Sequence, residues 1–237
     1  MLRTRSLATR SGLALAALAA SALLGACGGS ASTASPATSS SAASGIDQKT
    51  GPEISAAAQK AALAAKSVHV KGKAGTTEIE LSIDDSGAVG TVGIPGGKVD
   101  LVRVGPKYWI KAEAAFWVKS GVPAATATKL NGKFVDVSAQ SAQFEGFASV
   151  QKFFGTTSQG TKATKGETST VNGVKVIALK DTDGSTLFVA LEGDPFPIRI
   201  TNTGANGGQL DFSDWNVPVK VTAPTADQII DVTTLGG

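Results

Sequence analysis

The sequence predicts an α+β fold, in which an antiparallel sheet of about ten strands is combined with a few helices. Three observations support this class. Apolar side chains recur at every second position from Ser67 onward, as at Val68 and Val70. Short turns rich in Gly, Asn and Asp separate these runs, and Asn172-Gly173 is the clearest hairpin signal. An alanine-rich stretch precedes the first run and favours a helix.

Residues 1–26 have the order of an export signal. Arg3, Arg5 and Arg10 precede an apolar run of about 12 residues, which is shorter than the roughly 20 needed to span a bilayer. The run ends at Leu24-Gly25-Ala26-Cys27, and Cys27 is the only cysteine of the chain. The segment resembles a lipoprotein signal peptide, which implies that Cys27 carries lipid and becomes the mature N-terminus. The alternative is an ordinary secretory signal that a cysteine follows by chance.

Residues 27–50 form the predicted tether. The stretch is dominated by Ser, Ala, Thr and Gly, and Ile46 is its one large apolar side chain. Such a composition buries too little apolar surface to offset the entropy of ordering, which predicts a disordered linker. It is either a bare spacer or a substrate for O-glycosylation.

Residues 51–237 form the predicted folded domain. Pro52 and Glu53 suit the first turn of a helix that runs to Lys66. The middle of the chain predicts two further short helices, over 123–130 and 149–154, and the end predicts a helical turn over 226–232. The expected strands lie at 68–71, 79–83, 99–104, 107–112, 116–118, 167–171, 174–180, 185–191, 198–203, 209–212 and 215–221. The insertion between residues 113 and 159 is expected to cover one face of the sheet.

The charge balance argues against some partners. The whole chain has 22 Lys and Arg against 19 Asp and Glu, but three of the arginines lie in 1–26, so the mature part carries 19 of each. A neutral domain gives no electrostatic reason to expect a nucleic-acid partner. The expected partner is the membrane, through the lipid on Cys27, at the extracytoplasmic face; the domain is expected to be a monomer.

No constellation of side chains predicts catalysis. The chain has one histidine, His69, which alternation places on the polar face of a strand, and the one cysteine is assigned to the anchor. These residues make neither a cysteine–histidine dyad nor a histidine-rich metal site, and no serine has a Gly-x-Ser-x-Gly context. Asp181-x-Asp183 with Glu192 departs from a calcium loop, because Thr186 stands where that loop needs glycine. We therefore expect a hairpin turn there, no cofactor and no metal.

Two C-terminal segments carry a family resemblance. They are Gly193-Asp194-Pro195-Phe196-Pro197-Ile198-Arg199-Ile200 and Phe212-Ser213-Asp214-Trp215-Asn216-Val217-Pro218-Val219. With residues 57–74, 171–176 and the lipobox, they resemble the LppX/LprAFG lipoproteins of actinobacteria and, more loosely, the LolA/LolB-like carriers. The resemblance implies a strongly curved half-barrel with helices on its concave face, and a cavity that holds acyl chains of lipids or lipoglycans.

Two classes of function follow. The first is a lipid carrier, for which we expect one set of residues to line the cavity: Val176, Leu187, Val189, Leu191 and Ile200. Alternation places Leu187, Val189 and Leu191 on one strand face and Phe188 on the other. The second class is a structural or interaction lipoprotein with a closed core, in which the same strand is simply covered on both sides.

Overall fold

The computed structural model describes residues 45–94, 96–147, 149–155, 162–204 and 207–231. The predicted signal peptide, Cys27 and most of the predicted tether lie outside the described residues. The helical elements are η1 (Ile46–Gln48), α1 (Gly51–Ala64), α2 (Ala114–Lys119), α3 (Ala124–Leu130), η2 (Ser138–Phe147) and α4 (Val150–Gly155). Within the described part of the chain, no helix is long and apolar enough to cross a membrane.

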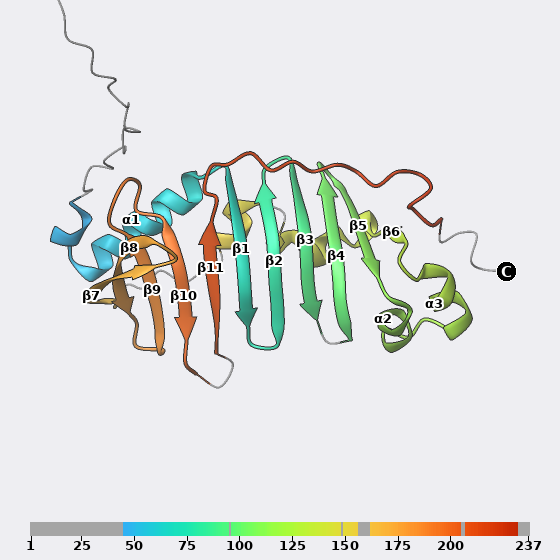
Figure 1. Ribbon diagram of the computed structural model, residues 1–237, viewed down its shortest axis with the longest axis horizontal. Coiled ribbons are helices and arrows are strands. Elements are labelled where there is room, and N and C mark those ends of the chain that lie inside the picture. The colour runs from blue at the N-terminus through green and yellow to red at the C-terminus, as the bar shows by residue number, and fades with distance from the viewer. Residues whose placement is uncertain (1–44, 95, 148, 156–161, 205–206, 232–237) are drawn as a thin grey trace, which may run out of the picture. The chain divides into compact units, whose positions relative to one another are not determined.

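Eleven strands form one antiparallel sheet. They are β1 (Ser67–Ala74), β2 (Thr77–Asp84), β3 (Gly87–Ile94), β4 (Gly97–Val104), β5 (Lys107–Ala112), β6 (Phe134–Asp136), β7 (Thr164–Val171), β8 (Val174–Lys180), β9 (Ser185–Ala190), β10 (Pro197–Asn202) and β11 (Gly208–Ser213). Their order is β6-β5-β4-β3-β2-β1-β11-β10-β9-β8-β7. Two meanders are thus joined where β1 pairs with β11. Since β6 and β7 stand at opposite edges, the curved sheet does not close, and the predicted half-barrel is confirmed (Figure 1).

Local sequence explains the starts and turns of these elements. Glu53 accepts hydrogen bonds from the backbone N–H and the hydroxyl of Thr50, at 2.8 and 2.7 Å, and so caps α1. Asn172 and Gly173 both have positive φ, 50° and 81°, as a two-residue hairpin with this twist requires. The Asp84 carboxylate caps the β2–β3 turn by accepting from the backbone N–H groups of Ser86 and Gly87.

α1 lies on one face of the sheet, here called the inner face, whereas α2 and α3 lie beside its β5–β6 end (Figure 1). Cross-strand partners on that face include Val70, Leu81, Leu101 and Ile110, all buried. Val150 of α4 belongs to the same core, so the middle insertion covers the sheet as expected. The opposite, outer face carries exposed charged pairs, among them Lys71–Glu80 and Lys98–Glu78.

The packed structure starts before the boundary expected at residue 51. Ile46 in η1 is 3 % exposed and packs with Ile54 and Ala58 of α1. The Lys165 ammonium also donates to the backbone carbonyl of Asp47, at 2.8 Å. The C-terminal end of the predicted tether is therefore part of the domain, because its one large apolar side chain is buried there.

Two expected strands are wrong. Residues 116–118 lie in α2, where Phe116 and Trp117 are both buried against the core. Three residues are too few to separate a period of two from a helical turn. The segment 215–221 has no strand assignment, because β11 is already paired on both sides by β1 and β10. Pro218 also removes one backbone donor from it. This segment instead runs along the ends of the strands towards β6 (Figure 1).

Candidate ligand-binding surfaces

Leu187, Val189 and Leu191, three of the five predicted cavity residues, lie on the inner face. They pack in one cluster with Ile54 and Ala58 of α1. Val189 is fully buried, while Leu187 and Leu191 are half-buried. The strand face chosen from alternation is thus the face that meets the helices, and α1 packs over Val189.

Val176 lies on the other face, and this placement corrects the prediction that all five residues share one surface. Its cross-strand partner is Ala190, the neighbour of Val189, and directly paired residues share a face. Val176 packs with Val171 and Ile198, away from α1. The residue of β8 that joins Val189 on the inner face is Ile177.

Ile200, the fifth predicted residue, belongs to a strip that runs across three strands. Ile200 pairs directly with Leu187 of β9 and with Leu210 of β11. All three side chains are half-buried, whereas Val189 beside them is fully buried. We call Leu187, Ile200 and Leu210 the aliphatic strip. Leu210 was missed in the sequence because Gly208 and Gln209 make its strand short and polar.

Aromatic side chains gather beside this strip. Phe154 of α4 lies 5.2 Å from Phe212 of β11 and 5.4 Å from Trp215, measured between ring centroids. Phe196 stacks on Trp215 at 4.7 Å, with the ring planes 6° apart. The Trp215 indole donates to the carbonyl of Pro197 at 3.0 Å, which fixes its orientation. Spacing along the sequence could not show that these rings meet, because they come from separate segments of the chain.

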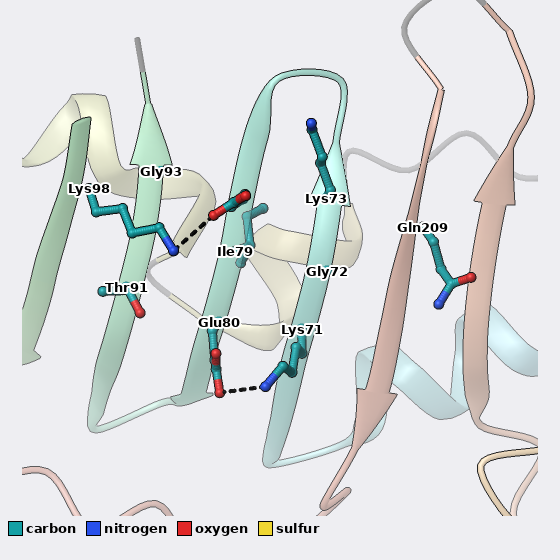
Figure 2. A pocket seen from close by; sticks show the side chains of 10 residues that line it. Lys71, Gly72, Lys73, Ile79, Glu80, Thr91, Gly93, Lys98 and Gln209 are labelled. Carbon is teal, nitrogen blue, oxygen red and sulfur yellow. Dashed lines mark hydrogen bonds and ion pairs between the residues drawn. The ribbon is translucent and has the colours of Figure 1, made fainter. Parts of the chain in front are cut away.

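The outer face carries a shallow pocket of about 410 Å³ across β11 and β1 to β4. Its lining is Lys71, Gly72, Lys73, Glu78, Ile79, Glu80, Thr91, Gly93, Lys98 and Gln209. Lys71 pairs with Glu80 at 3.0 Å, and Lys98 pairs with Glu78 at 2.9 Å (Figure 2). The Lys98 contact lowers the pKa of Glu78, through a hydrogen bond and charge attraction. Sequence reasoning assigned no site to these residues, because most of them lie on the polar face of ordinary strands.

A third charged pair lies further along the outer face, on β10 and β11. The Arg199 guanidinium donates to the Asp211 carboxylate at 2.5 Å, and its other end donates to the Asn172 amide oxygen. Burial raises the pKa of Asp211, but the hydrogen bonds from Arg199 and Gln209 outweigh it and the net pKa is lowered. The link to Asn172 places the β7–β8 turn near β10, on the face where Val176 is buried.

His69 and Asp181 lie where the sequence predicted them, His69 beside a polar side chain of the next strand and Asp181 in a hairpin turn. The Nδ1 atom of His69 lies 3.0 Å from the Ser82 hydroxyl, its cross-strand partner. Asp181 closes a hairpin turn, in which its backbone N–H donates to the Ser185 carbonyl. Across the described ranges, no group of three His, Cys, Asp or Glu side chains could hold a metal ion.

Comparison with solved structures finds several similar chains. The structure matches LprF from Mycobacterium bovis with a TM-score of 0.54 at 13% sequence identity, over 74% of this chain and 97% of the other. The lipoprotein LppX of Mycobacterium tuberculosis matches with a TM-score of 0.46 at 15% identity, over 72% and 99% of the two chains. A LolA superfamily protein from Nitrosomonas europaea matches with a TM-score of 0.23 at 11% identity, over 78% and 99%.

Sequence comparison gives no match: no family model and no curated protein matches this chain. The likeness to LprF establishes the fold, and it confirms the LppX/LprAFG-like architecture expected from the two C-terminal segments.

Proposed function

We propose that this chain is an exported, lipid-anchored protein that binds an acyl chain along the inner face of its sheet. The observation that supports the proposal is the aliphatic strip. Leu187, Ile200 and Leu210 stand side by side on three strands and stay half-buried, whereas Val70, Leu81 and Val189 on the same face are fully buried. An acyl chain lying on them gains about 0.8 kcal/mol for each buried methylene.

The anchor part of the proposal rests on the lipobox. Cys27 follows small residues at the end of an apolar run, where a lipoprotein signal requires it. Cys27→Ser should release the protein from the membrane fraction or leave it unprocessed, as seen by fractionation and by mobility on a gel. An unchanged membrane fraction and mobility would contradict the anchor.

A closed-core interaction lipoprotein is the second candidate, and one observation favours it. Val189 is fully buried against α1, so the part of the inner face under this helix is packed. In that case the aliphatic strip is a half-covered core edge and binds no lipid.

The test compares neighbouring residues of β10 that point to opposite faces. Ile200→Asn places an amide on the aliphatic strip, and Thr201→Asn places the same amide on the outer face. Binding of a fluorescent fatty acid to the delipidated full-length protein is measured, with circular dichroism to check the fold.

We expect Ile200→Asn to weaken binding about tenfold, because an unpaired amide in an apolar contact costs about 1–3 kcal/mol. Thr201→Asn should bind as the wild type does. Equal binding by both variants refutes the strip as the site, and no binding by the wild type leaves the closed core.

A further inference from the structure

The outer-face pocket is hollowed by small residues of β3. Gly93 stands between Glu78 of β2 and Lys98 of β4 in the strand register. Because Gly93 has no side chain, Lys98 reaches across β3 to Glu78 (Figure 2). Thr91, two residues earlier on the same strand face, adds a hydroxyl to the floor. The floor is thus small and polar, which does not suit an acyl chain.

The charges of the lining do not cancel. Three lysines face two glutamates, a net charge of +1. Lys71 and Lys98 each have a carboxylate partner, while Lys73 has no ion-pair or hydrogen-bond partner among the described residues. In Figure 2 the Lys73 side chain lies near the β1–β2 turn, away from the Lys71–Glu80 pair. One ammonium is therefore available to an incoming ligand.

The existing ion pairs are easily rearranged. Side-chain exposure is 70% and 54% for Lys98 and Glu78, and 63% and 52% for Lys71 and Glu80. Solvent screens exposed pairs of this kind, so they contribute little to stability. Lys98 can therefore exchange Glu78 for another anion at little cost. Glu78 occupies the place that such an anion would take and competes with it.

We propose that this pocket binds an anionic group of the phosphate class, held over Gly93 by the ammonium groups of Lys73 and Lys98 and by the Thr91 hydroxyl. Lysine binds phosphate as a point charge with several donors, and the hydroxyl supplies a further donor. The site lies on the face opposite the aliphatic strip, so it stands independently of acyl-chain binding.

The charge argument predicts changes of opposite sign. Glu78→Gln removes the competing carboxylate and should tighten binding of inorganic phosphate about fivefold, which corresponds to a unit charge about 4 Å away in water. Lys73→Gln should weaken binding by a similar factor. Glu192→Gln is the matched control, because it frees Lys175 from an exposed pair of the same length, 2.9 Å, outside the pocket.

The measurement is an NMR titration of the full-length protein in neutral detergent with sodium phosphate, at an ionic strength held constant with chloride. The amide signals of Thr91 and Gly93 report on the floor of the pocket. A second titration uses dihexanoyl-phosphatidylglycerol, with dihexanoyl-phosphatidylcholine for comparison. Thermal melts confirm that the variants stay folded.

Each outcome decides the proposal. Saturable shifts with inorganic phosphate, strengthened by Glu78→Gln and weakened by Lys73→Gln, support a site for a free phosphate group. The same pattern with phosphatidylglycerol alone assigns the site to a lipid headgroup. Absence of saturation with both probes, or equal effects of Glu78→Gln and Glu192→Gln, overturns the proposal.

Discussion

Val189→Trp tests whether the inner face is packed beneath α1. Val189 is fully buried, and it packs with Ile54 and Ala58 of the helix and with Ile177, its partner on β8. The indole cannot fit unless α1 or its neighbours shift. Overpacking of this kind costs about 1–3 kcal/mol.

The expected effect can be expressed as a melting temperature. In a domain of this size, each kcal/mol lowers Tm by about 2–4 °C, so Val189→Trp should lower Tm by about 2–12 °C. The assay is thermal unfolding of the full-length protein, followed by circular dichroism after delipidation. Leu187→Trp is the matched control, because Leu187 lies two residues away on the same face and is half-buried. It should stay within about 2 °C of the wild type, since a partly exposed site lets the ring turn outward.

One result would refute the reasoning. If Val189→Trp has the same Tm as the wild type, there is room under α1, and the cavity predicted from the family resemblance extends beneath the helix. A large loss for Leu187→Trp alone would show that the aliphatic strip, and not the α1 contact, is the tightly packed region.

Three further predictions concern the fold. Gly90→Ala should destabilise the domain by at least about 2 kcal/mol in urea unfolding. The backbone φ of Gly90 is +150°, and an added Cβ would lie 2.0 Å from the Glu80 carbonyl oxygen. Gly105→Ala is the control: Gly105 has φ +54° and open space around it, so this variant should lose only about 1–2 kcal/mol. Asp211 has a pKa below its ordinary value of 3.8, so its contribution to stability is present above that value and is lost as the pH falls through its lowered pKa. Asp211→Asn should therefore reduce the fall of the unfolding free energy at acid pH. An unchanged acid dependence would contradict the Arg199 contact. Limited proteolysis should trim the chain no further than residue 45, because Ile46 is buried. Ile46→Asp should move the cleavage limit towards α1. Protection that reaches Ser30 would show that more of the tether packs on the domain.

The sequence by itself determined the local structure of this protein. Some features depend only on residues that are close in the sequence: the hairpins at Asn172-Gly173 and Asp84–Gly87, the capped start of α1 and the strand alternation. The same alternation correctly separated Leu187 and Val189 from Phe188. It failed at 116–118, where three apolar residues fit a helix as well as a strand, and at 215–221, where no free strand edge is left to pair with.

Tertiary structure decided on which faces of the sheet the candidate site residues lie. Val176 alternates as regularly as Val189, yet the register of β8 against β9 places it on the opposite face. The aliphatic strip and the outer pocket each combine side chains from three or more strands, and β11 joins β1 across more than a hundred residues of chain. Spacing along the chain does not encode such register, because strand order and pairing are set only when the whole sheet packs around its core.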